Sequence, residues 1–248
     1  MLVTGATGTL GRQVVPAAVA AGHSVRGLSR RERPDEDGVS WRAGDLMTGE
    51  GVDAAVNGAE MIVHCATQPT PGNDVVAAEK LVAAAQRAGV SHVVYVSIVG
   101  VDRIPLPYYR TKLDVENVVA GCGIEHTILR ATQFHDLVAH LFAIQQYSPV
   151  LWALRDTRFQ PIGTHDVAAR LVEIAGQSPA GRAPDIGGPE IRSHSELGQA
   201  YLRSRRSRRR VLSVPLPGRI AAAYRSGAHL APQNPIGSIT FEHYLARS

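Results

Sequence analysis

Three glycines near the start of the chain constrain its fold more than any other feature. The segment LVTGATGTLGRQVV, residues 2–15, places them at intervals of three, after a short apolar run and directly before a helical pattern. One glycine allows a sharp turn, the next lets a ligand approach the backbone, and the third lets helix and strand pack closely. The following helix offers free amides and its positive dipole end to an anion. The spacing therefore predicts a pyrophosphate-binding loop, the alternative being a tight turn without a ligand. The residues predicted to contact a dinucleotide here are Gly5, Thr7, Gly8, Thr9, Leu10 and Gly11.

Apolar runs rich in Val and Ile alternate with helical patterns along the next hundred residues, which indicates an α/β fold with a mostly parallel sheet. The expected strands are 1–4, 24–28, 39–43, 60–65, 92–97 and 124–130, and the expected helices are 9–21, 50–57, 74–88 and 110–120. Right-handed crossovers then give a Rossmann-type, doubly wound sheet that binds ligands at the carboxyl ends of its strands. Left-handed glycine caps are expected after the helices, at Gly22, Gly58, Gly89 and Gly121.

The alternation loosens after residue 132, where proline-rich stretches and short helical patterns follow. No internal repeat and no long linker divides the chain. We therefore expect one NAD(P)-binding Rossmann domain over residues 1–248, with 133–160 and 185–248 forming a small C-terminal substrate-binding lobe.

The tip of the second expected strand indicates which dinucleotide binds. An acid at this tip favours NAD, whereas an arginine accommodates the 2′-phosphate of NADP. The strand runs into Ser29, Arg30 and Arg31 with no acid, and Arg12 follows the last glycine of the loop. A guanidinium can give a phosphate two charge-assisted hydrogen bonds, so NADP(H) is preferred over NAD(H). The alternative is a pair of solvated loop arginines.

Two further loops fit the same site. Asp45 and Leu46 follow the third strand, where they would bind the adenine amino group and pack on its ring, although Asp45 could equally cap a helix. The small residues Cys65, Ala66 and Thr67 follow the fourth strand, beside the expected ribose.

A candidate catalytic set follows the fifth strand, which ends in Ser97. Tyr108 and Lys112 lie four residues apart, so a helix places both on one face. An ammonium beside a phenol favours the phenolate, and a nearby serine hydroxyl can polarise a substrate oxygen. The Tyr-x-x-x-Lys spacing also arises by chance in helices, and Tyr109 is an alternative inward-pointing residue.

Several function classes are disfavoured. The apolar runs are too short to span a membrane, no secretory signal is visible, and Cys65 and Cys122 suit a reduced, cytoplasmic setting. The ten histidines are scattered without zinc-ligand spacing, so no metal is expected, and no Gly-x-Ser-x-Gly elbow indicates a hydrolase.

The net charge of +4 is local, because without the six arginines of 203–210 the acidic residues would outnumber the basic ones. Such a run can be a nucleic-acid patch. No aromatic residues interleave with it for base stacking, and a solvated helix end followed by a strand is the favoured interpretation.

Together these residues resemble the short-chain dehydrogenase/reductase superfamily, specifically its atypical, NmrA-like NAD(P)H-binding branch. TGATGTLG is similar to the glycine loop of that branch, and Ser97, Tyr108 and Lys112 match the Ser and Tyr-x-x-x-Lys positions of the superfamily. ILRATQFHD is similar to the segment that lines the nicotinamide, which implies cofactor contacts at Ala131, Thr132 and Phe134.

The resemblance implies an NADPH-dependent oxidoreductase acting on a carbonyl or quinone-like small molecule. Two alternatives remain: a non-catalytic NADP(H) sensor with a regulatory protein partner, and a sugar-nucleotide epimerase or dehydratase, which Arg30 and Arg31 disfavour. A homodimer is usual for the superfamily.

Overall fold

The computed structural model describes residues 1–68, 70 and 72–247, which form two compact units. The first unit comprises residues 1–97, 107–130 and 167–184, and the second comprises 98–106, 131–166 and 185–248. Both predicted lobe segments, 133–160 and 185–248, belong to the second unit. A single domain over the whole chain stays a prediction.

A seven-stranded parallel sheet forms the centre of the first unit, and it confirms the predicted α/β class. Its strand order is β3-β2-β1-β4-β5-β6-β9, so the order reverses between β1 and β4. The strands are β1 (Leu2–Thr4), β2 (Val25–Ser29), β3 (Val39–Ala43), β4 (Met61–His64), β5 (His92–Ile98), β6 (His126–Ala131) and β9 (Gly181–Arg182). All six predicted strands are present; the central strands β1, β4, β5 and β6 are mostly buried, whereas the edge strand β3 is largely half-buried.

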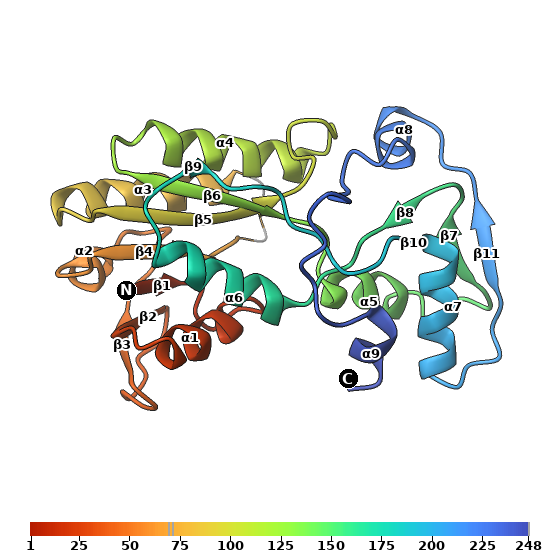
Figure 1. Cartoon of the computed structure of the whole chain (residues 1–248), viewed down its shortest axis with the longest axis horizontal. Helices are drawn as coiled ribbons and strands as arrows, with labels where there is room; N and C mark the ends of the chain where they lie inside the picture. The colour runs from red at the N-terminus through yellow and green to blue at the C-terminus, as the bar shows by residue number, and fades with distance from the viewer. Residues whose placement is uncertain (69, 71, 248) are drawn as a thin grey trace. The chain divides into compact units, whose positions relative to one another are not determined.

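Helices cover both faces of this sheet, as Figure 1 shows, with α3 and α4 above it and α1 and α6 below it. Apolar side chains of α2, α3 and α4 share one core cluster with the sheet, which includes Leu81, Val115 and Tyr95. The helices are α1 (Gly11–Ala20), α2 (Val52–Val56), α3 (Asn73–Arg87), α4 (Pro107–Gly121) and α6 (Thr164–Ala175).

Three of the four predicted glycine caps are confirmed, because Gly22, Gly58 and Gly89 have φ values of 84°, 74° and 70°. The fourth prediction was wrong. Gly121 is the last residue of α4, and the left-handed position is Gly123, with φ 75°. The helix continues through Gly121, so the chain reverses two residues later than the pattern indicated.

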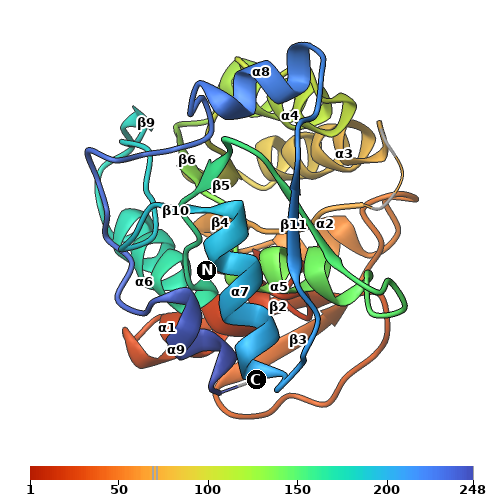
Figure 2. The ribbon, with the colours of Figure 1, turned by 90° about the vertical axis from the view of Figure 1, so that its right-hand side faces the viewer.

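The second unit packs short elements around its own core, which includes Phe142, Leu151 and Leu197. Figure 2 shows β11 running beside α7, and β11 pairs in parallel with β7. The elements are α5 (His135–Ala143), β7 (Leu151–Leu154), β8 (Arg158–Phe159), β10 (Arg192–Ser193), α7 (His194–Ser204), β11 (Val211–Val214), α8 (Arg219–Arg225) and α9 (Phe241–Leu245). The arginine run 203–210 joins the end of α7 to β11, as the favoured interpretation predicted.

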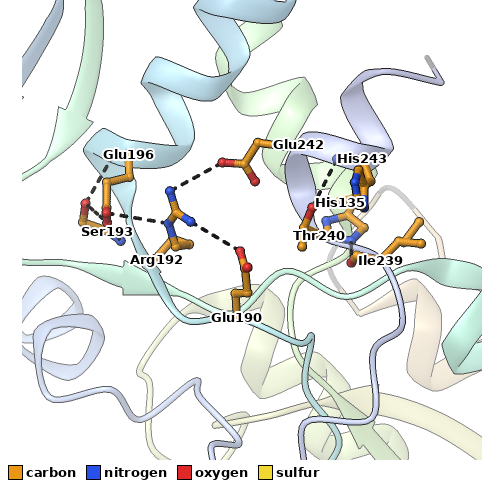
Figure 3. Close-up of polar contacts among 9 residues, drawn as sticks. All are labelled: His135, Glu190, Arg192, Ser193, Glu196, Ile239, Thr240, Glu242 and His243. Atoms are coloured by element: carbon orange, nitrogen blue, oxygen red, sulfur yellow. Dashed lines mark hydrogen bonds and ion pairs between the residues drawn. The ribbon is translucent and has the colours of Figure 1, made fainter.

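Arg192 links three elements of the second unit through carboxylates (Figure 3). Its guanidinium lies 3.4 Å from Glu190 Oε2, 3.6 Å from Glu196 Oε1 and 3.5 Å from Glu242 Oε1. Ser193 and Glu196 form a capping box at the start of α7. Each charged group in this cluster lies near a group of opposite charge. The cluster therefore holds β10, α7 and α9 together.

Candidate active site

The glycine loop has the geometry that a phosphate-binding turn requires. A Cβ on Gly11 would lie 2.1 Å from the Gly5 carbonyl oxygen, and one on Gly5 would lie 2.6 Å from the Ala66 nitrogen. Gly5 also has φ +64°, so both positions exclude larger residues. Thr7, Gly8 and Thr9 are exposed at the N-terminus of the ten-residue helix α1. Their backbone is therefore accessible to a ligand, and the loop fits the pyrophosphate of a dinucleotide.

Two arginines at the end of β2 are free to meet an anion. Arg30 and Arg31 are exposed, and neither forms an ion pair with a described residue. The Arg31 amide donates to Ser29 Oγ over 3.2 Å, which orders the turn at the strand tip. Arg12 is tied differently, because its Nε donates to the Thr7 carbonyl over 2.9 Å within the glycine loop. Arg12 therefore supports the loop, while Arg30 and Arg31 offer the unpaired charge.

The two other predicted cofactor loops differ in how open they are. Asp45 Oδ1 accepts from the Met47 amide over 2.7 Å, which makes Asp45 a turn residue rather than a cap of α2. Leu46 is 5% exposed and packs in the core beneath. After β4, Thr67 is exposed, whereas burial raises the pKa of the Cys65 thiol to about 12 and keeps it protonated. The adenine and ribose contacts stay predictions.

The three residues predicted to line the nicotinamide lie in the second unit. Ala131 and Thr132 are buried, and the Thr132 hydroxyl donates to the Gln160 carbonyl over 2.6 Å. Phe134 is partly buried just before α5. Their cofactor contacts stay predictions as well.

The catalytic candidates Tyr108 and Lys112 occupy the first two turns of α4, and the structure brings them together. Lys112 Nζ lies 5.6 Å from the centre of the Tyr108 ring and 5.7 Å from that of Tyr95. Tyr108 is 43% exposed, whereas Tyr109 is buried in the core. Tyr108 is therefore the tyrosine that solvent or a substrate can reach.

Ser97 lies near the carboxyl end of β5 and is buried. Within the described ranges its Oγ has no hydrogen-bond partner. A buried hydroxyl without a partner is costly, so it is available to a polar atom of a ligand.

One residue of this site was missed by sequence reasoning: Asp74, the second residue of α3. Its Oδ2 lies 2.9 Å from Lys112 Nζ and accepts from the Thr67 hydroxyl over 2.9 Å, while its Oδ1 accepts from the Gln68 amide. The side chain of Lys112 is 7% exposed and that of Asp74 is 4% exposed. Acidic residues are common in the first turn of a helix, so the sequence does not single out Asp74. Its partner Lys112 becomes visible only when α3 packs beside α4.

The Asp74 contact changes the electrostatics expected from the sequence. Burial disfavours the ammonium, but the Asp74 carboxylate 2.9 Å away outweighs this cost, so the pKa of Lys112 is raised. Lys112 therefore stays protonated. The Asp74 carboxylate partly neutralises its charge, so the charge does not act on Tyr108 alone.

A buried histidine completes the surroundings. His64 accepts from or donates to Thr4 Oγ1 over 2.7 Å and stacks on Tyr95 with ring centres 5.4 Å apart. Burial, assisted by Lys112, lowers the pKa of His64 to about 4, so it is neutral near pH 7.

Comparisons with known proteins agree with this geometry. A family described as NAD(P)H-binding matches residues 5–177, well over half of the chain. A reductase of (4-alkanoyl-5-oxo-2,5-dihydrofuran-3-yl)methyl phosphate from Streptomyces griseus is 30% identical over 199 residues, which are 77% of this chain and 68% of that protein. Photosystem II assembly factor Ycf39 of Trieres chinensis is 29% identical over 68% of this chain, and the match spans 57% of that relative's length.

Among solved structures, an NADPH complex of the quinone oxidoreductase QOR2 from Escherichia coli superposes with a TM-score of 0.82 at 17% identity, covering 99% of this chain and 98% of that one. This likeness supports the fold. No helix in the described part of the chain is long and apolar enough to cross a bilayer. The glycine loop, the parallel sheet and the match over residues 5–177 together show that the chain belongs to the NAD(P)H-binding family, the NmrA-like branch of the atypical short-chain dehydrogenases/reductases.

Proposed function

We propose that this protein is an NADPH-dependent reductase of a carbonyl or quinone-like small molecule. The observation that carries the proposal is the placement of an exposed phenol, Tyr108, beside a buried cation, Lys112, on the unit that also holds the glycine loop. The reductases and quinone oxidoreductases among its relatives and neighbours support this reaction class.

The residues present fit a dinucleotide. Gly5, Gly8 and Gly11 would hold the pyrophosphate, and Arg30 with Arg31 would meet a 2′-phosphate. The bound nicotinamide would supply the hydride. Tyr108 would hold the proton that the substrate oxygen needs, and the Ser97 hydroxyl would orient that oxygen.

The cofactor preference is tested by fluorescence titration of NADPH against NADH. We expect the wild-type protein to bind NADPH at least tenfold more tightly, since each bidentate arginine–phosphate contact is strong. Replacing both Arg30 and Arg31 by serine should remove this preference and leave NADH binding unchanged. The matched control is Arg110→Ser, an exposed arginine on α4. Equal affinities for both cofactors in the wild type would contradict the NADP(H) assignment.

The reaction class is tested by oxidation of NADPH with a panel of quinones and aldehydes. Turnover with at least one of them is expected. NADPH binding without turnover across the panel would instead favour the second candidate, an NADP(H) sensor that binds a regulatory protein. The offset charge of Lys112 is the observation that favours that candidate.

A further inference from the structure

The hydrogen bonds around Tyr108 form a chain with a direction. The Thr67 hydroxyl has a single hydrogen, and it donates this hydrogen to Asp74 Oδ2 over 2.9 Å. The Tyr108 hydroxyl lies 3.4 Å from Thr67 Oγ1. Because Thr67 has no second hydrogen to give, Tyr108 must be the donor in that contact. In this arrangement the Tyr108 hydroxyl carries its hydrogen and points it at Thr67.

The charges near the phenol favour the same state. Lys112 from α4 and Asp74 from α3 are the charged groups that face it, and they form an ion pair of 2.9 Å. From the sheet and the loop after β4, the titratable neighbours of the pair are Tyr95, the neutral His64 and the protonated Cys65. An ammonium that is offset by a carboxylate stabilises a phenolate much less than an unpaired one.

From this arrangement we infer that Asp74 is a positioning residue that keeps Tyr108 protonated, and so holds in place the proton that reduction of a carbonyl or quinone needs. The use of that proton in reduction rests on the proposed function; the inference about the state of Tyr108 does not.

The step balances as a reduction. Bound NADPH would supply the hydride to the substrate, the Tyr108 O–H bond would break, and the substrate oxygen would gain that proton, which leaves NADP⁺ and the reduced product. The phenolate then regains a proton from water, which reaches Tyr108 because this side chain is 43% exposed.

The first test needs no turnover. The near-ultraviolet absorbance of phenolate is measured at about pH 9 in the wild type and in Asp74→Asn, each with its Tyr108→Phe counterpart subtracted, so that the difference reports Tyr108 alone. We expect Asp74→Asn to raise the phenolate-to-phenol ratio of Tyr108 about tenfold, because Lys112 is then uncompensated. Asp114→Asn, an exposed carboxylate on α4, should leave the ratio unchanged. An unchanged ratio in folded Asp74→Asn overturns the inference.

A second variant decides the matter if Asp74→Asn does not fold. Thr67 is exposed, so Thr67→Val should fold, with Thr67→Ser as the matched control that retains the hydroxyl. If Tyr108 donates to Thr67, removing this acceptor raises the phenolate fraction, whereas a Thr67 that donates to Tyr108 would give a lower fraction after removal. A fall in the phenolate fraction overturns the inference.

The second test uses the pH profile of carbonyl reduction. Asp74→Asn should move the alkaline fall of the reduction rate about one pH unit lower, because reduction needs the phenol proton and the variant loses it sooner. No turnover at any pH, together with the expected absorbance change, would overturn the proposed reaction and keep the role of Asp74. Turnover whose alkaline fall does not move would overturn the role of Asp74 and keep the reaction.

Discussion

Helix α4 carries two buried ion pairs one helical turn apart, and they differ in what surrounds them. Glu116 pairs with Arg130 through two hydrogen bonds of 2.8 and 2.6 Å, with both side chains at most 7% exposed. Lys112 meets Asp74 through one contact, and Asp74 also accepts from Thr67 and Gln68 of the loop after β4. The first pair joins a helix to the sheet. The second pair joins α4 to α3, and Asp74 also binds a loop predicted to hold the cofactor, beside an exposed tyrosine.

The comparison shows that equal burial does not mean an equal role. A bidentate arginine–carboxylate pair gains geometric specificity and fixes packing. A lysine held by one contact keeps hydrogens for other acceptors. We therefore assign Arg130–Glu116 to stability and Lys112–Asp74 to the site.

The largest expected effect is on the first pair. Glu116→Gln leaves the Arg130 guanidinium buried without its counter-charge, and should lower the free energy of unfolding by about 4 kcal/mol. Urea unfolding measures this, with the exposed Glu79→Gln on α3 as control. Cofactor affinity of the folded fraction should not change; a tenfold loss of NADPH affinity would erase the distinction between the two pairs.

Lowering the pH should destabilise the protein through His64, which lies near the Lys112–Asp74 pair. The pKa of His64 is about 4 in the folded protein and near 6.5 in the unfolded chain. Between these values the unfolded chain binds a proton that the folded one does not. Stability is therefore complete above about pH 6.5 and falls toward pH 4, by about 3 kcal/mol for His64 alone.

His194 and His229, also lowered to about 4 by burial in the second unit, should add to the loss. Unfolding curves at several pH values measure it, and His64→Gln should remove its share, while the exposed His165→Gln should not. An equal loss in both variants would show that His64 is not the source.

A smaller loss of stability is expected for Asp74→Asn, about 2 kcal/mol, because the amide keeps one acceptor oxygen, which can still accept from either Thr67 or Gln68. The same urea experiment measures it beside Glu116→Gln. If Asp74→Asn proves the more destabilising of the two, the second pair is chiefly structural.

The smallest effect is expected at a third, exposed pair. Arg87 Nη2 lies 2.5 Å from Asp53 Oδ1, but the two side chains are 62% and 69% exposed. Asp53→Asn should change the free energy of unfolding by less than about 0.5 kcal/mol, and added salt should not alter that result. A change above about 1 kcal/mol would mean that burial is the wrong criterion for ranking these pairs.

Sequence reasoning predicted the sheet and the glycine loop because both depend on local signals. Periodicity located β1 to β6, and the spacing of Gly5, Gly8 and Gly11 located the turn. The partners of α4 could not be predicted in this way, since Asp74 and Lys112 are far apart in the chain and meet only when α3 packs on α4. The predicted left-handed cap at Gly121 was wrong for a related reason, because a glycine in the sequence does not indicate whether the helix ends before or after it.

The most direct test of the proposed function is NADPH oxidation by Tyr108→Phe beside the wild type, using the best acceptor of the panel. Removing the proton donor should lower kcat by about 100-fold or more, with NADPH affinity and stability unchanged. The matched control is Tyr147→Phe, a tyrosine that is 92% exposed, and it should behave as the wild type. Undiminished turnover in Tyr108→Phe would contradict the account.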